Sequence, residues 1–245
     1  MPRQNATPGG PSADASGGRG ESVRRAYDQL RELIVHGRLA PGSRIIESDL
    51  ADRLGVSRTP IRSALHRLQQ EGYVASVERA KEPRLIVAPL TQSDAMELFE
   101  IIGQLEGLAA RAAAERPPKE RLALVQQLRA LNGKFETIAR TPHPDPSRLF
   151  EVDMRFHHTF VAAAAGPRLL ALHDAIKPQA ERYARLYSQL LQDEIAVSVA
   201  EHAILYTAIE AGSPPQAEQA AEYNWHNAAA RLTRAIGVRG ELGSW

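Results

Sequence analysis

Residues 55–65 read Gly-Val-Ser-Arg-Thr-Pro-Ile-Arg-Ser-Ala-Leu, and this stretch decides the interpretation of the front of the chain. Ser57 is a favourable helix N-cap, and Pro60 follows in the first turn, where its missing N–H breaks no hydrogen bond. Apolar residues then recur at helical spacing and predict a buried face. Arg58 and Arg62 lie one turn apart on the opposite face. A helix with this arginine stripe suits the major groove of DNA.

The residues around this helix predict a winged helix-turn-helix. Residues 48–54 form a short amphipathic helix that Gly55 would end, and a glycine turn between two helices is typical of the motif. Any helical hairpin can use such a turn, so the segments before and after it are needed to identify the motif. Upstream, residues 22–36 predict another helix, and downstream, residues 73–77 and 85–87 predict two strands.

This front segment resembles the DNA-binding domain of the GntR family of bacterial transcription regulators over residues 23–90. The run 57–62, Ser-Arg-Thr-Pro-Ile-Arg, carries the resemblance most specifically, with support from residues 50–54 and 64–72. The resemblance implies that two arginines read bases and that neighbouring hydroxyls touch phosphates. The expected DNA-binding residues are Ser57, Arg58, Thr59, Arg62, Ser48 and, at the wing tip, Arg79 and Lys81.

Composition excludes several classes of protein. The chain has 245 residues, enough for two cores, and no cysteine, so a disulfide scaffold is impossible. No apolar run approaches the roughly 18 residues that span a bilayer, and the N-terminus has no signal-like segment. We therefore expect a cytoplasmic protein without a membrane partner. Residues 1–90 hold 14 Lys and Arg against 10 Asp and Glu, whereas residues 91–245 hold 16 against 19.

The chain is expected to be mainly α, with four parts. Residues 1–20 are rich in glycine and predict a disordered arm; residues 21–90 predict the winged helix-turn-helix domain. Residues 91–238 predict an all-α domain for effector binding and dimerisation, followed by a tail at 239–245. Proline and glycine breaks divide this domain into a six-helix bundle. The predicted helices cover residues 92–115, 119–139, 146–165, 167–190, 193–212 and 214–236.

Polar residues occupy inward positions of this bundle. Asp153 and His157 are four residues apart and share one helix face, His202 lies on the buried side of a later helix, and Asn224 points inward from the last. His226 lies about 200° further around that last helix. A buried carboxylate needs a neutralising partner, and carboxylate with imidazole suits Zn, Ni, Mn or Fe. The alternative is a buried Asp–His hydrogen bond without a metal.

Residues 92–236 resemble the six-helix, FCD-type ligand domain in the FadR branch of the GntR family. The resemblance rests on residues 97–100 and 105–109, on Asp153-x-x-x-His157, and on Glu201-His202. It implies a divalent transition metal held by one Asp and three His. Asp153, His157 and His202 fill three places, Asn224 occupies the fourth, and His226 is a less favoured substitute. Gln104, Arg155 and Tyr183 are the candidate lining of an effector pocket.

The sequence therefore predicts a ligand-responsive DNA-binding transcription regulator rather than an enzyme. We expect a homodimeric repressor released from a near-palindromic, double-stranded operator by a small effector, such as an organic acid, bound near the metal. One alternative is a metal-dependent enzyme tethered by the winged helix, for which Glu106 and Glu201 would be the bases, although both fit surface or capping roles better. Another is a regulator that dimerises without an effector. Every interpretation in which the protein binds DNA requires Arg58 and Arg62 to face outward and to be unoccupied by the protein's own carboxylates.

Overall fold

The structure is a computed structural model and describes residues 15–77, 84–187, 190 and 194–243. The chain divides into two compact units. The first contains the residues up to Leu33 together with Arg44–Ile86, and the second contains Ile34–Ser43 together with Val87–Trp245. The sequence predicted a single boundary after residue 90. The two divisions differ because the turn at 37–43 is bonded to Val87 and therefore belongs to the second unit. The Gly42 N–H donates to the Val87 carbonyl at 2.9 Å.

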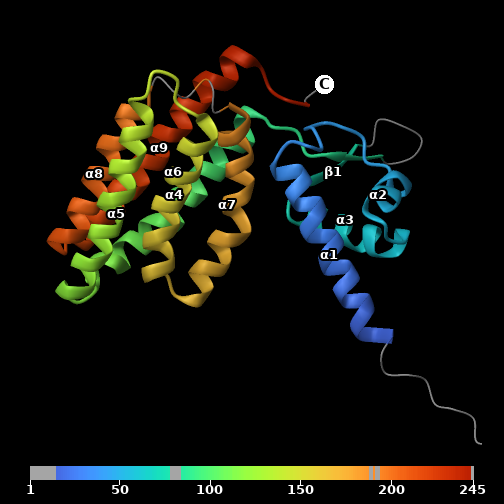
Figure 1. The fold of residues 1–245 in the computed structure, drawn as a ribbon, viewed down its shortest axis with the longest axis horizontal. Helices are drawn as coiled ribbons and strands as arrows, with labels where there is room; N and C mark the ends of the chain where they lie inside the picture. Colours follow the sequence, from blue (N-terminus) through green and yellow to red (C-terminus); the bar gives the residue numbers. More distant parts are fainter. Residues whose placement is uncertain (1–14, 78–83, 188–189, 191–193, 244–245) are drawn as a thin grey trace, which may run out of the picture. The chain divides into compact units, whose positions relative to one another are not determined.

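The first unit is the predicted winged helix (Figure 1). Its core is made by the apolar faces of all three helices and includes the buried residues Leu30, Leu50, Ile61 and Leu65. Gly55 ends the second helix at φ 65°, a left-handed conformation that glycine adopts without strain. The elements are α1 (Ala15–Val35), α2 (Glu47–Leu54), α3 (Arg58–Gln70), β1 (Val74–Val77) and β2 (Arg84–Val87).

Two predictions for this unit need adjustment. Helix α1 begins at Ala15, so it extends into the segment predicted as a disordered arm, of which residues 1–14 lie outside the described part of the chain. The Gly-Gly pair at 17–18 has poor helix propensity, which is why the sequence placed the start later. The predicted wing-tip residues Arg79 and Lys81 also lie outside the described residues.

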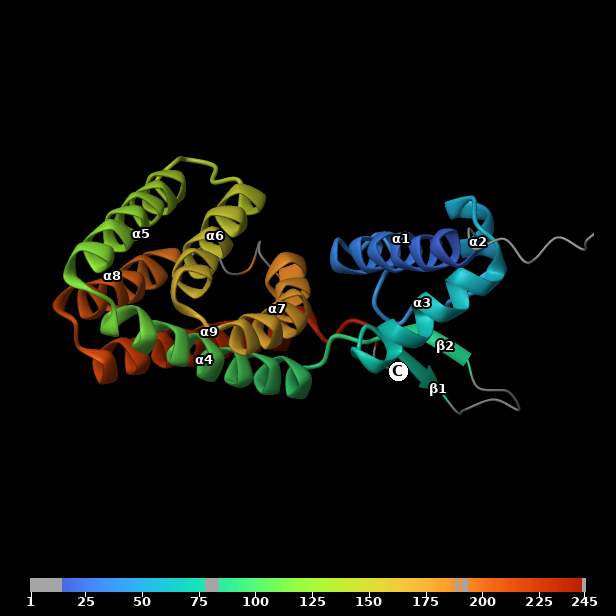
Figure 2. The same ribbon diagram turned by 90° about the horizontal axis from the view of Figure 1, so that it is seen from below.

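The second unit is the predicted all-α bundle, so the expected mainly α fold class is confirmed. Each of the six predicted segments forms a helix whose ends differ from the prediction by a few residues. Figures 1 and 2 show α5 lying beside α6 and α8. The helices are α4 (Gln92–Glu115), α5 (Pro118–Ala139), α6 (Pro146–Ala164), α7 (Pro167–Tyr187), α8 (Ile195–Ala211) and α9 (Pro214–Arg239).

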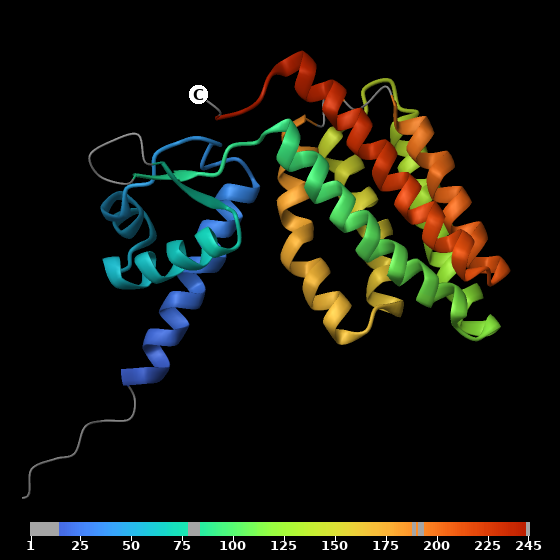
Figure 3. The same cartoon turned by 180° about the vertical axis from the view of Figure 1, so that it is seen from behind.

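Helices α4 and α9 pack closely along most of their length, as Figure 3 shows. Glycines on α4 permit this approach. A Cβ at Gly103 would lie 3.1 Å from the Trp225 Cβ, and a Cβ at Gly107 would lie 3.1 Å from the Glu222 Cγ. The close contact brings Trp225 of α9 against α4 in the bundle interior.

The predicted C-terminal tail is attached to the bundle. Helix α9 continues to Arg239, and Leu242 then pairs with Leu90 in an antiparallel bridge. The Leu90 N–H donates to the Leu242 carbonyl at 2.8 Å, and the Leu242 N–H returns the bond at 3.1 Å. None of the helices within the described ranges has the length and apolar character required to cross a membrane.

Candidate DNA-binding face and candidate metal site

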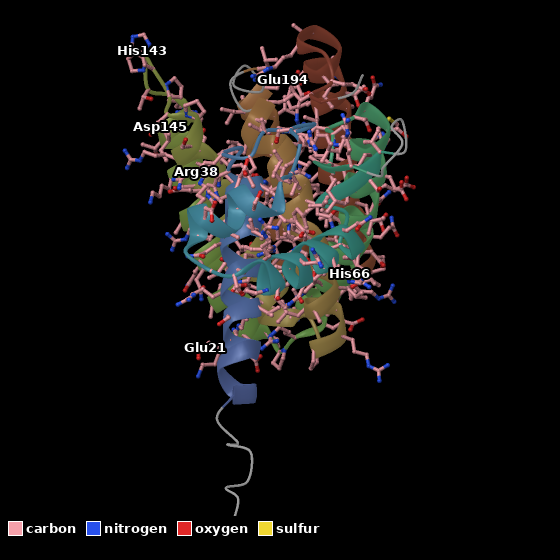
Figure 4. The ribbon with its side chains drawn as sticks, turned by 90° about the vertical axis from the view of Figure 1, so that its right-hand side faces the viewer. Glu21, Arg38, His66, His143, Asp145 and Glu194 are labelled. Carbon is pink, nitrogen blue, oxygen red and sulfur yellow. The ribbon has the colours of Figure 1, made fainter. Side chains whose placement is uncertain are left out.

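Helix α3 presents a polar face to solvent. Arg58, Arg62 and His66 are exposed, whereas Ile61 and Ala64 on the other side of the helix are fully buried. Figure 4 shows His66 on the outer surface of this helix. The arginine stripe therefore has the outward orientation that the sequence interpretation requires.

Arg62 has a partner that the sequence analysis missed. Its Nη2 donates to Glu47 Oε2 at 2.9 Å, and its Nε lies 3.2 and 3.3 Å from the two oxygens of the same carboxylate. The condition that both arginines be unoccupied by the protein's own carboxylates is therefore not met at Arg62. The arginine side chain nevertheless remains 74% exposed, and water screens such pairs so strongly that they contribute little to stability. Among the described residues, no hydrogen bond involves Nη1 of Arg62.

The predicted phosphate-contacting hydroxyls surround the start of α3. Ser57 and Thr59 are exposed and line a surface hollow together with Arg25 of α1. Ser57 has the extended backbone of an N-cap, but its side chain makes no capping bond. Ser48 is half-buried and donates to Asp49 Oδ1 at 3.2 Å. These groups can supply hydroxyl and N–H donors to phosphate oxygens.

In the bundle, the structure brings together the three metal-ligand candidates. Asp153 and His157 come from α6 and His202 from α8, and one potential ligand atom of each lies within 4.8 Å of the others. Asp153 Oδ1 is 3.4 Å from His202 Nε2. Both histidines are buried, whereas the Asp153 side chain is 26% exposed and lines a cavity. The predicted convergence of these side chains is therefore present.

The neighbours of His202 leave the lone pair of its Nε2 available to coordinate a metal. Asn132 donates its Nδ2 to the Val199 carbonyl at 3.0 Å, which leaves its Oδ1 as an acceptor 3.1 Å from His202 Nδ1. The proton of His202 is thereby assigned to Nδ1, and the lone pair to Nε2. That Nε2 atom is buried with no hydrogen-bond partner among the described residues. Phe156 stacks on the imidazole ring at a centroid distance of 4.0 Å.

His157 is oriented by a buried carboxylate, Glu106 of α4. Glu106 accepts from His157 Nδ1 at 2.6 Å, Trp225 Nε1 at 2.8 Å and Lys177 Nζ at 2.9 Å, and lies 3.1 Å from His173 Nε2. Glu106 is fully buried, so its interpretation as a surface or capping residue was wrong. Because Nδ1 of His157 is bonded to Glu106, its Nε2 is the nitrogen left for a metal.

The pKa shifts of the buried groups around this site differ in direction. Burial lowers the pKa of His202 well below its ordinary value, which favours the neutral ring that a metal ligand needs. Burial alone would raise the pKa of Glu106, but His157 and Lys177 outweigh burial and hold this pKa well below its usual range. Burial raises the pKa of Asp153. Although the raised pKa disfavours ionised Asp153, two imidazole nitrogens and a carboxylate oxygen are a donor set that suits a divalent transition metal.

Asn224 is buried and lines the same cavity, as the sequence predicted for the fourth position. Its Nδ2 donates to Glu201 Oε2 at 2.8 Å, and since a carboxylate only accepts, the amide oxygen is the group left for a metal. Glu201 is buried and also binds Arg231, so its interpretation as a surface or capping residue was wrong. His226 is exposed and lines a groove between α4 and α9, so the regular helix rules it out as a substitute ligand.

The cavity beside these residues has a volume of about 130 Å³ and differs from the predicted effector pocket. Arg155 is exposed, and Gln104 is exposed in the groove between α4 and α9. Tyr183 is fully buried; its hydroxyl donates to Asp94 Oδ2 at 2.6 Å and accepts from the Thr91 N–H. None of these three residues therefore lines the cavity beside Asp153, His157 and Asn224. The cavity instead contains two buried cations that the sequence analysis missed, Lys177 of α7 and Arg231 of α9.

Comparisons with known proteins agree with this two-part architecture. Residues 22–80 match the gntR family of bacterial regulatory proteins, and residues 97–227 match the FCD domain. A probable D-xylose utilization operon transcriptional repressor of Paenarthrobacter nicotinovorans is 31% identical over 198 residues, covering 78% of this chain and 82% of that protein. An HTH-type transcriptional regulator of Streptomyces ambofaciens is 31% identical over 217 residues, covering 80% of this chain and 79% of that protein.

Solved structures share the fold. The structure titled E. coli McbR/YncC has a TM-score of 0.64 at 21% identity, covering 87% of this chain and 97% of that one. A GntR transcriptional regulator from Rhodococcus sp. RHA1 has a TM-score of 0.65 at 21% identity, covering 86% and 97%. The family and the named relatives are transcription regulators rather than enzymes. The chain belongs to the gntR family of bacterial regulatory proteins and is a DNA-binding regulator with a C-terminal FCD domain.

Proposed function

We propose that this protein is a repressor of the FadR branch that binds a near-palindromic operator as a homodimer. A small organic acid, held beside a divalent metal in the bundle, releases it. The observation that carries the proposal is that one chain has both an exposed arginine face on α3 and the Asp153–His157–His202 cluster, whose two histidines are buried. The site of action is the cytoplasm, where the chromosomal operator lies.

The proposed DNA contacts divide into two kinds. Arg58 and Arg62 read base edges, since guanidinium groups match the two acceptors of guanine in the major groove. Ser57, Thr59 and Ser48 contact phosphates, as do the wing-tip cations Arg79 and Lys81. The net charge of the chain is only +1, so a few placed side chains and dimerisation supply the affinity rather than a strong general field.

The proposed metal is Zn, Ni, Mn or Fe, held by Asp153, His157 and His202 with the Asn224 amide oxygen as a fourth ligand. When bound, it supplies a Lewis-acidic centre to which a carboxylate can coordinate. The residues of the cavity would orient that carboxylate. Lys177 and Arg231 lend positive charge there, although each also binds a buried glutamate, at 2.9 and 3.0 Å. This combination supports an anionic effector.

The proposed operator has two half-sites, and a homodimer suits it because each subunit would supply one recognition helix to one half-site. Large apolar side chains are exposed on the bundle helices and would be covered in a dimer. Leu108 of α4 is 49% exposed, Ile204 of α8 is 56% exposed and Tyr223 of α9 is 55% exposed. An effector changes DNA affinity only if it binds two packings of this bundle with different affinities.

DNA reading is tested by selecting an operator from randomised duplexes and comparing Arg62→Ala with Lys134→Ala. Lys134 is an exposed cation of α5, far from α3 in sequence, and is the matched control for loss of one positive charge. We expect Arg62→Ala to weaken operator binding by about 1–3 kcal/mol and Lys134→Ala to leave it unchanged. Equal binding by both variants would contradict the assignment of α3.

The metal and effector are tested by thermal shift and operator release. Zinc at about 100 times its Kd should stabilise the wild type by about 2.7 kcal/mol. Asp153→Ala should lose that shift, whereas Glu151→Ala, an exposed carboxylate on the same helix, should keep it. A panel of mono-, di- and tricarboxylic acids is then screened for release of the operator. Zinc stabilisation that persists in Asp153→Ala would refute the site.

A further inference from the structure

We propose that Glu47 is a positioning residue for DNA recognition: it holds the Arg62 guanidinium so that one edge faces a guanine. The inference rests on the proposed DNA-binding function and adds a residue that determines base specificity. Glu47 is the first residue of α2, and Arg62 lies in the second turn of α3. Their contact joins the two helices of the helix-turn-helix on its exposed side.

The contact geometry selects which part of the guanidinium remains for DNA. Glu47 accepts from Nε and Nη2 of Arg62, at distances of 2.9–3.3 Å. A guanidinium has five N–H groups in a rigid plane, so the Nε–H and one Nη2–H are engaged. The edge formed by Nη1 and the outer Nη2–H remains. Its two parallel donors match O6 and N7 of guanine in the major groove.

The anchored partner in this contact is the carboxylate. The Glu47 side chain is 29% exposed, whereas the Arg62 side chain is 74% exposed. Glu47 also lies at the N-terminus of α2, where the helix dipole favours a negative charge. A flexible arginine that is held at Nε loses fewer conformations when it meets a base, and preorganisation of this kind increases selectivity.

A carboxylate beside DNA has a second consequence, of opposite sign. It repels phosphates, so it weakens binding to every sequence while sharpening the preference for one base. Removal of Glu47 should therefore tighten binding to scrambled duplex and reduce discrimination at one base pair per half-site. A competing account treats the pair as a clamp that blocks Arg62, and it makes a different prediction: removal of Glu47 would tighten operator binding above all.

The test measures dissociation constants of the full-length chain on the selected operator, on its single base-pair variants and on a scrambled duplex. Glu47→Ala is compared with Asp49→Ala, which removes another first-turn carboxylate of α2 that bonds Ser48 rather than Arg62. We expect Glu47→Ala alone to lose about tenfold discrimination at one base pair of each half-site. Arg62→Lys should lose it at the same pair, because lysine lacks the planar fork. The double variant Glu47→Ala/Arg62→Lys should lose no more discrimination at that base pair than Arg62→Lys alone.

Both alanine variants should bind scrambled duplex more tightly than the wild type. The inference is overturned if Glu47→Ala discriminates between base pairs as well as the wild type or Asp49→Ala does. It is also overturned if Glu47→Ala loses discrimination at a different base pair from Arg62→Lys, or if it tightens binding to the operator more than binding to scrambled duplex. Loss of discrimination by Arg62→Lys with no change in Glu47→Ala would overturn this inference alone. A wild-type chain that selects no sequence would overturn the proposed function as well. Equal melting temperatures of the two alanine variants show that both are folded.

Discussion

Glu106→Gln removes one negative charge from the bundle core while keeping the shape of the side chain. In the wild type, the carboxylate accepts from His157, Trp225 and Lys177 and lies within hydrogen-bond distance of His173. Glutamine offers a single acceptor oxygen, and its amide nitrogen would face other donors. Lys177, with a side chain only 7% exposed, would lose its counter-charge.

The size of the effect follows from burial. Hydrogen bonds to charged groups contribute about 1.5–3 kcal/mol each, but adding four of them would overstate the loss because the donors share one charge. Breaking a buried ion pair by removing one partner costs about 3–5 kcal/mol, and this figure sets our expectation for Glu106→Gln. Adding Lys177→Met should recover part of the loss, because the uncompensated buried charge is then gone.

Urea unfolding followed by tryptophan fluorescence measures this change, because Trp225, one of the two tryptophans, donates to Glu106 itself. Glu115→Gln is the control: Glu115 is also on α4, but its side chain is 56% exposed and pairs with Arg111 at the surface. We expect that control to lie within about 0.5 kcal/mol of the wild type. The same Glu106→Gln variant should bind zinc about 10–100 times more weakly, since His157 loses its orienting acceptor. Equal unfolding midpoints for the two glutamine variants would refute the reasoning.

Three further predictions concern the bundle. The pKa of His202 lies below the value of about 6.5 that histidine has in an unfolded chain, so the free energy of unfolding should fall as pH drops below about 6.5. Thermal melting at pH 8.0 and 5.5 measures this loss, with His202→Ala for comparison. Gly103→Ala should destabilise the bundle by about 1–3 kcal/mol because the added Cβ would crowd Trp225. Gly133→Ala, where the added Cβ meets open space, should stabilise the bundle by about 0.4–1 kcal/mol, and urea unfolding measures both changes. Asn132→Ala should weaken zinc binding about tenfold or more, measured by titration, because His202 loses the acceptor of its Nδ1 proton; unchanged affinity would contradict that role.

The helices and their buried faces were predictable because their signals are local. Amphipathic spacing and breaks such as Gly166-Pro167 predicted the bundle helices, and Asp153 and His157 fell on one face through simple helical geometry. The outward side of α3 was predictable for the same reason. The fourth position, Asn224, was also predicted inward, and the structure buries it against Glu201.

The charged partners were not predictable from sequence, because a charged residue in an amphipathic pattern normally indicates a solvated face. Glu106 and Lys177 are 71 positions apart, and Glu201 and Arg231 are 30 apart, yet each pair is buried in contact. Nothing local distinguishes such residues from surface ones. The same holds for Tyr183, whose hydroxyl bonds Asp94 inside the fold rather than lining a pocket.

The sequence by itself determined which segments are helical and which residues face the core, and it predicted that Asp153 and His157 share one helix face. Those properties depend on neighbours three or four positions away along one helix. Tertiary structure decided which charges are buried, which nitrogen of each histidine is left for a metal, and that Glu47 holds Arg62. The reason is that electrostatic and hydrogen-bond energies depend on distances between helices, and the packing of the whole chain sets those distances.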